Sequence, residues 1–139
     1  MTKFSIMKRI VLAVSILLAT TLTLTSCFKD LPVDEDGLLI TFREECFVSN
    51  FELLGTDFQT VRFGAAVIDT TAQTINVTVL TGTDLKNVYP QFTLATDCKL
   101  DPKITGRVDM SDLANPRQWT VVSGNRKIRK TYKVIVKYQ

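Results

Sequence analysis

Short segments in which hydrophobic and polar residues alternate recur along this chain from residue 38 onward. The clearest runs from Thr74 to Leu80, where isoleucine and valine at every second position alternate with threonine and asparagine. Alternation with a period of two predicts β-strands that bury one face. The same pattern, interrupted by turn residues, predicts further strands at 46–54, 91–96, 117–122 and 130–138, and a weaker one at 61–68, where Gly64-Ala65-Ala66 interrupts it. Residues 38–42 are either a short strand or the end of the N-terminal tether.

The number and spacing of these segments predict one all-β domain over residues 38–139. Short strands separated by frequent turns are typical of an Ig-like antiparallel β-sandwich of about seven strands. The last two strands form a closing hairpin around Ser123-Gly124-Asn125. In its second arm we expect one buried face, made of Tyr132, Val134, Val136 and Tyr138, and one solvent face with Lys133 and Lys137.

The N-terminal segment has a different pattern. Lys3, Lys8 and Arg9 precede an uncharged run from Ile10 to Leu24, which is typical of an export signal helix. The run ends in Leu24-Thr25-Ser26-Cys27, which resembles the lipobox of bacterial lipoproteins. We therefore predict that residues 1–26 are a removed signal peptide and that Cys27 is lipidated. The alternatives are an ordinary secretory signal and an uncleaved anchor, although a bilayer span needs roughly 20 apolar residues.

Residues 27–37 are acidic and are expected to form a flexible tether. Asp30, Asp34, Glu35 and Asp36 are opposed only by Lys29. The segment resembles the acidic export tag of Bacteroidetes lipoproteins that are displayed on the outer membrane, although a merely solvated linker would have the same composition. We expect a lipid-anchored outer-membrane protein whose membrane contact is the anchor, with the outer face favoured over the periplasmic face.

Charge and composition exclude several functions. The signal segment supplies the whole net charge of +3, so residues 27–139 are balanced and the pI of 8.8 does not indicate nucleic-acid binding. Residues 126–137 are basic without an acid, which indicates either a solvated hairpin face or a patch for an anionic glycan, lipopolysaccharide or protein partner. The sequence has no histidine, which excludes Ser-His-Asp and Cys-His catalysis. We expect neither an enzyme nor a cofactor.

Two cysteines remain after Cys27. Cys46 and Cys98 could pair outside the cytoplasm, or stay as two buried thiols, and the sequence leaves both alternatives open.

Other polar motifs are candidate metal, catalytic or modification sites. Asp97, Asp101, Asp109 and Asp112 could bind a hard cation or act as an acid pair, but aspartate also favours turns, and we expect no metal site. Asp69-Thr70-Thr71 resembles a short O-glycosylation sequon, which makes Thr70 a candidate for modification.

Aromatic side chains of the closing hairpin are the candidate glycan contacts. Sugars stack on rings that combine an apolar face with a polar edge. Trp119, Tyr132 and Tyr138 qualify if they are exposed, whereas packing inside the sandwich is the alternative.

Several motifs in order resemble a known family. They are Glu45-Cys46, Ile68-Asp69, and segments 74–79, 82–85, 89–94 and 119–136. Together they are similar to the N-terminal Ig-like domain of Bacteroidetes lipoproteins that also carry a domain associated with carbohydrate metabolism. Here that second domain is expected to be absent, and Gly124-Asn125 replaces the usual Asp-Gly of the hairpin.

The resemblance implies a non-catalytic cell-envelope lipoprotein that binds glycan or assists glycan uptake. The alternative is a structural module or adhesin, including a pilus-type subunit that exchanges a strand with a neighbour. An exposed aromatic platform would favour glycan binding, and an apolar groove between the sheets would favour strand exchange.

Overall fold

The computed structural model describes residues 5–11 and 30–139, which fall into two separate units divided after Asp30. Residues 5–11 are helical. Within the described ranges, no helix reaches the length and apolarity that a bilayer crossing requires. Cys27 and most of the predicted signal peptide lie outside the described residues.

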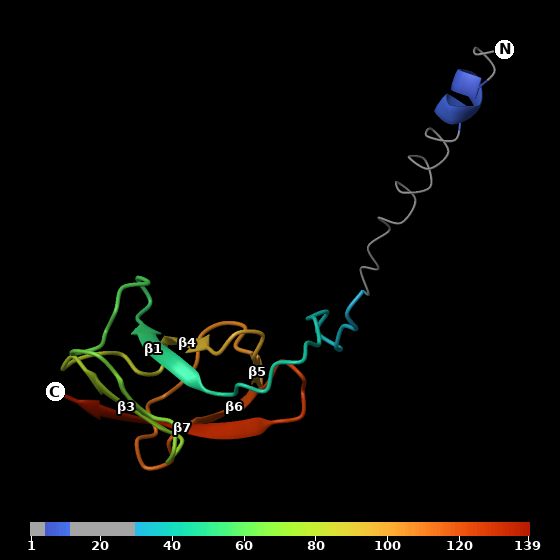
Figure 1. Ribbon diagram of the computed structural model, residues 1–139. Helices are drawn as coiled ribbons and strands as arrows, with labels where there is room; N and C mark the ends of the chain where they lie inside the picture. The colour runs from blue at the N-terminus through green and yellow to red at the C-terminus, as the bar shows by residue number, and fades with distance from the viewer. Residues whose placement is uncertain (1–4, 12–29) are drawn as a thin grey trace. The chain divides into compact units, whose positions relative to one another are not determined.

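The unit from Leu31 to Gln139 consists of two β-sheets (Figure 1). The smaller sheet pairs β1 (Val48–Leu54) with β4 (Tyr89–Leu94) in antiparallel register. The larger sheet has the order β2-β3-β7-β6-β5. Its strands are β2 (Val67–Asp69), β3 (Thr74–Val79), β5 (Lys99–Asp101), β6 (Gln118–Val122) and β7 (Arg129–Tyr138).

The predicted all-β sandwich of about seven strands is confirmed, with one difference in pairing. β3 and β7 run parallel, with Ile75 opposite Val134 and Val77 opposite Val136, whereas the other pairs are antiparallel. Parallel neighbours need a long crossover connection. The chain from β4 to β6 provides it, and this non-local pairing leaves no mark on local alternation.

The core lies between the two sheets. β1 and β4 contribute Phe51, Leu53 and the half-buried Phe92, and the larger sheet contributes its alternating valines together with Trp119 and Tyr132. Phe51 meets Phe92 edge-on at a centroid distance of 4.9 Å, and Phe92 meets Trp119 across the sandwich at 5.3 Å. Such aromatic contacts join the sheets beyond simple area burial.

The strands differ from the predicted ones at three places. Residues 38–42 are not a strand and contain only an isolated bridge between Leu39 and Val33. The predicted strand 61–68 is reduced to β2, because Gly64 adopts a φ of 77° that interrupts extended backbone. β5 was not predicted, because three residues followed by Pro102 show too little alternation.

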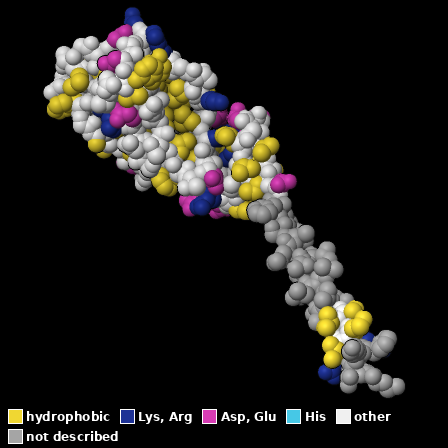
Figure 2. Space-filling view, turned by 90° about the horizontal axis from the view of Figure 1, so that it is seen from above, with side chains coloured by type: hydrophobic (Ala, Val, Ile, Leu, Met, Phe, Trp, Pro, Cys, Tyr) yellow, Lys and Arg dark blue, Asp and Glu magenta, His cyan; other side chains and the backbone are white. Residues whose placement is uncertain are grey.

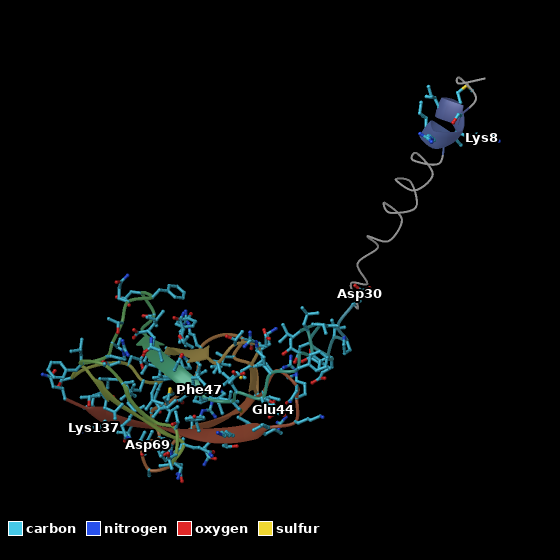
Figure 3. The ribbon with its side chains drawn as sticks, in the orientation of Figure 1. Lys8, Asp30, Glu44, Phe47, Asp69 and Lys137 are labelled. Atoms are coloured by element: carbon cyan, nitrogen blue, oxygen red, sulfur yellow. The ribbon has the colours of Figure 1, made fainter. Side chains whose placement is uncertain are left out.

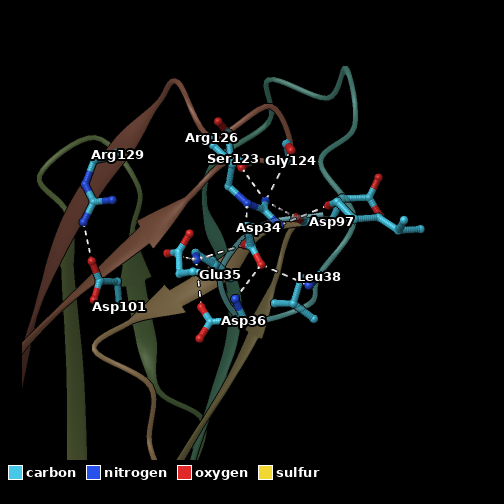
Figure 4. Close-up of polar contacts among 12 residues, drawn as sticks. Asp34, Glu35, Asp36, Leu38, Asp97, Asp101, Ser123, Gly124, Arg126 and Arg129 are labelled. Carbon is cyan, nitrogen blue, oxygen red and sulfur yellow. Dashed lines mark hydrogen bonds and ion pairs between the residues drawn. The ribbon is translucent and has the colours of Figure 1, made fainter. Parts of the chain in front are cut away.

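Residues 33–39 are docked on the sandwich and are not a free tether (Figure 4). The Asp34 carboxylate accepts hydrogen bonds from Lys99 Nζ at 2.9 Å, Arg126 Nε at 3.0 Å, and the backbone amides of Asp36 and Leu38. Its side chain is only 3% exposed. The prediction of a solvated acidic tether is therefore wrong for Asp34, because two cations that are distant in sequence hold it.

Candidate functional site

The hairpin aromatics predicted as glycan contacts are mostly buried. Tyr132 is 0% exposed and Trp119 is 5% exposed. Both side chains lie on the inward face of the larger sheet, where Trp119 on β6 is opposite Tyr132 on β7. The prediction that these two rings contact glycan is therefore wrong, because their faces are covered by the core. Tyr138 is 43% exposed at the end of β7, and its hydroxyl donates to the Thr83 carbonyl.

A different pair of aromatic rings forms an exposed platform. Phe58 is 62% exposed and stacks on the half-buried Tyr89, with a centroid distance of 4.7 Å and an interplanar angle of 28°. Figure 2 shows that hydrophobic side chains reach the surface of the domain at several places among charged ones. We call Phe58 and Tyr89 the aromatic platform.

The chain builds this platform from three segments. Leu54 at the end of β1 is opposite Tyr89 at the start of β4. A tight loop follows β1, closed by hydrogen bonds between Gly55 and Gln59 and from the Phe58 amide to the Gly55 carbonyl. This loop returns Phe58 over Tyr89. The third segment, residues 107–109, is held beside Tyr89 by the bridge between Val88 and Val108.

The backbone of Phe58 is in the left-handed region, with a φ of 58°. That conformation is costly for a bulky side chain and is often found where function demands it. The sequence pattern predicted a strand that ends at residue 54, followed by turn residues, but did not identify Phe58 as a candidate contact. The available signal was an apolar aromatic residue placed in an otherwise polar turn.

Arg107 joins the platform to a cationic pocket. Its Nε donates to the Tyr89 hydroxyl at 3.0 Å, and this hydrogen bond raises the pKa of Arg107. Arg107 also lines an open pocket of about 440 Å³ together with Lys103, Arg117 and Trp119. The remaining lining consists of Pro102, Ile104, Thr105, Gly106, Val108, Pro116 and Gln118, so its lining side chains include cations and no carboxylate.

A second hollow separates the two sheets at one side of the sandwich. β4 pairs only with β1 among the described strands, and β5 pairs only with β6. The opening between β4 and β5 is a groove of about 610 Å³, lined by Phe92, Leu94, Leu100 and Ile104 with polar residues at its rim. Lys103 and Ile104 line both this groove and the cationic pocket.

The two cysteines of the domain are neighbours. Both are free thiols in the structure. Cys46 donates to the Val121 carbonyl, and Cys98 donates to the carbonyl of Glu45, the residue that precedes Cys46. Burial raises the pKa of each thiol. The disulfide stays a prediction.

The four aspartates considered as a cation or acid-pair site do not form one cluster. Asp97 pairs with Arg43. Asp101 pairs with Arg129 (Figure 4). Asp109 and Asp112 each accept hydrogen bonds inside their own turns, from Ser111 and Asn115 respectively. Among the described residues no group of three or more potential ligands could hold a metal ion.

The remaining predicted positions lie on the surface. Thr70 is exposed in the turn between β2 and β3, where the Asp69 carboxylate caps the amides of Thr71 and Ala72. Its modification stays a prediction. Lys133 and Lys137 face solvent on β7, as expected, and Figure 3 labels Lys137 near the C-terminus. Arg126 and Arg129 carry ion pairs, so the basic run is partly neutralised.

Three solved structures that are similar to this chain come from Bacteroides. A glycoside hydrolase candidate from Bacteroides thetaiotaomicron is 27% identical with a TM-score of 0.57, and the match covers 68% of this chain and 25% of that one. A candidate secreted protein from Bacteroides fragilis is 11% identical, covers 69% and 97%, and has a TM-score of 0.50. A DUF4623 family protein from Bacteroides eggerthii is 16% identical, covers 68% and 22%, and has a TM-score of 0.51.

The chain thus spans about a quarter of the length of the hydrolase candidate, and no curated protein matches it. The family model described as "SGBP, N-terminal" matches residues 56–136, which is most of the sandwich and includes both rings of the platform. This confirms the resemblance to an N-terminal domain of carbohydrate-associated Bacteroidetes proteins. The chain belongs to the SGBP N-terminal family.

Proposed function

We propose that this protein is a non-catalytic lipoprotein of the cell envelope that contacts glycan through the aromatic platform. The supporting observation is the exposed Phe58 ring stacked on the half-buried Tyr89, an arrangement that requires left-handed backbone at Phe58. An exposed ring face with polar groups at its edge suits the apolar face of a sugar. Membership of the SGBP N-terminal family points to the same class of ligand.

The role is one of binding, within an assembly that captures or takes up glycan at the outer membrane. The sequence has no histidine, and the acids near the platform are engaged in turns. Lipid anchoring through Cys27 would keep the domain at the membrane surface, where a weak contact gains from high local concentration.

Affinity electrophoresis tests the proposal. The purified chain, kept in detergent, is run through gels that contain neutral or anionic polysaccharides. We expect retardation by at least one polysaccharide and its loss in Phe58→Ala. The matched control is Phe42→Ala. Phe42 is a 90% exposed phenylalanine that precedes β1, whereas Phe58 follows it. Absence of retardation on every polysaccharide, or equal loss in both variants, would contradict the proposal.

Strand exchange is the second candidate function, and the groove between β4 and β5 favours it. A strand from a second envelope subunit would add to the unpaired edge of β4 and place apolar side chains against Leu94, Leu100 and Ile104. Sedimentation velocity of the detergent-solubilised chain tests this with Ile104→Glu. Concentration-dependent association in the wild type that the variant lacks would support the second function over the first.

A further inference from the structure

The cationic pocket beside the platform defines the class of glycan. Resting on the proposed function, we infer that the ligand is an acidic glycan whose carboxylate or sulfate groups enter the pocket formed by Lys103, Arg107 and Arg117 while a neighbouring sugar ring stacks on Phe58. A platform alone would accept neutral sugars. The adjacent cations make the site selective for charge.

Three observations carry this step. The first is that the three cationic side chains are exposed around one pocket of about 440 Å³ whose lining side chains include no carboxylate. Arginine and lysine in such a setting are available to an external anion because no ion pair of the described residues involves them. By contrast, Arg43, Arg62, Lys99, Arg126 and Arg129 each form an ion pair.

The second observation is the position of Arg107. Its Nε is used by the Tyr89 hydroxyl, which fixes the guanidinium at the border between platform and pocket. The terminal nitrogens have no hydrogen bond to a described residue, and a guanidinium can bind carboxylate or sulfate oxygens with two parallel donors. Arg107 therefore orients the ring and offers a charge to the same ligand.

The third observation is size. The pocket has room for one charged sugar residue but is open, and Gln118 and Thr105 at its wall can donate to sugar hydroxyl groups. Trp119 also lines the pocket, but it is only 5% exposed. A chain of alternating stacked and charged sugar residues would match platform and pocket together.

Paired charge variants of the detergent-solubilised full chain test the inference. Lys103→Gln/Arg117→Gln removes two cations at the pocket, and Lys133→Gln/Lys137→Gln removes two exposed cations from the outward face of β7. Binding to polygalacturonate, heparin and neutral dextran is measured by affinity electrophoresis at two salt concentrations. We expect the pocket variant to weaken binding to an acidic glycan by about tenfold and the β7 variant by less than twofold.

The outcomes separate the inference from the proposed function. Preference for polygalacturonate identifies carboxylate as the recognised group, and preference for heparin identifies sulfate. Binding to dextran that Phe58→Ala abolishes and the pocket variant leaves unchanged would overturn the inference while the proposed function stands. If both charge variants lose the same amount of glycan binding, the effect is long-range electrostatic attraction, and the inference is overturned as well. No binding to any of the three glycans, even with the wild type, would count against both.

Discussion

Phe58 is the residue at which stability and the proposed function make opposite demands. Left-handed backbone costs a non-glycine residue roughly 1–2 kcal/mol, and the exposed ring recovers only part of this by stacking on Tyr89. A residue selected for folding alone at this position would be glycine or asparagine. A binding role for the aromatic platform would explain why phenylalanine occupies this strained position.

Replacing Phe58 with glycine makes this testable. Relief of the backbone strain should offset the lost ring stacking and the added chain entropy, so the free energy of unfolding should change by less than about 1 kcal/mol. Binding to any glycan that retards the wild type should fall at least tenfold. Chemical denaturation and affinity electrophoresis on the same preparation decide it, and a variant that binds normally would remove Phe58 from the site.

Asp34 makes a pH-dependent contribution. Burial raises the pKa of Asp34, but hydrogen bonds from Lys99, the Leu38 amide and Arg126 outweigh it and hold the pKa far below the ordinary value of 3.8. The partner effect is reciprocal, since Asp36, Glu35 and Asp34 raise the pKa of Lys99. A carboxyl whose pKa falls on folding stabilises the folded state above its ordinary pKa, and the contribution is lost as the pH drops below that value.

Asp34→Asn should therefore lower the melting temperature at pH 7 and flatten its decline between about pH 5 and pH 2. Glu44→Gln is the matched control, because Glu44 is an exposed acid outside this network. Thermal unfolding followed by circular dichroism at stepped pH is the measurement. If Asp34→Asn and the wild type decline in parallel, the network contributes nothing that is specific to the folded state.

At the scale of strands, alternation predicted what is local. β3 and β7 were predicted because valine and isoleucine at every second position leave one choice of buried face, and Ile75, Val77, Val134 and Val136 are all buried. Tyr138 shares the parity but is 43% exposed, so the buried face of β7 ends at Val136. β5 was missed, since a three-residue strand is defined by its partner β6 and not by its own sequence.

The candidate site was less predictable than the fold for the same reason. Tyr89 and Arg107 are brought together by a bridge between Val88 and Val108, and Phe58 reaches Tyr89 only because Leu54 is opposite it. These are non-local contacts that no periodicity encodes. Sequence reasoning correctly sought exposed aromatics but chose the hairpin, where the same alternation that identified the strand also buries Trp119 and Tyr132.

The face assignment of β7 has a direct test. Val134 is 1% exposed between β3 and β6, whereas Lys133 next to it faces solvent. Val134→Asp would place an unpaired carboxylate in the core, which should unfold the domain or cost more than about 3 kcal/mol. Lys133→Asp should change stability by no more than about 0.5 kcal/mol. Urea denaturation compares the two, and equal midpoints would invert the assignment.

The predicted disulfide would join Cys46, just before β1, to Cys98, in the loop between β4 and β5. Cys98 Sγ donates to the carbonyl of Glu45, which precedes Cys46, so the two cysteines are neighbours in the fold. Closing the chain between them would stabilise the fold by roughly 4 kcal/mol in the chain-entropy model. Titration of free thiols in protein unfolded without reductant shows whether the disulfide is present. Two reactive thiols besides Cys27 would show that Cys46 and Cys98 stay reduced.

For the whole molecule, docking of residues 33–39 changes how the domain would stand at a membrane. Because the Asp34 network holds this segment on the sandwich, only residues 27–32 would separate a lipidated Cys27 from the folded unit. Six residues reach at most about 20 Å when extended. The domain would then stay close to the membrane surface, with the docked segment at its membrane-proximal end.

Lipid anchoring itself is tested by Cys27→Ser. Each buried CH₂ of an acyl chain contributes about 0.8 kcal/mol, and more than one chain makes attachment effectively permanent. Loss of Cys27 should therefore move the protein from the membrane pellet to the soluble fraction. Cys98→Ser, which removes a half-buried thiol of the folded domain, should leave the protein in the pellet. Immunoblotting of separated fractions is the measurement. If Cys27→Ser stays in the pellet and a high-salt wash does not release it, something other than Cys27 anchors the protein. The proposal of a short lipid tether would then be wrong as well.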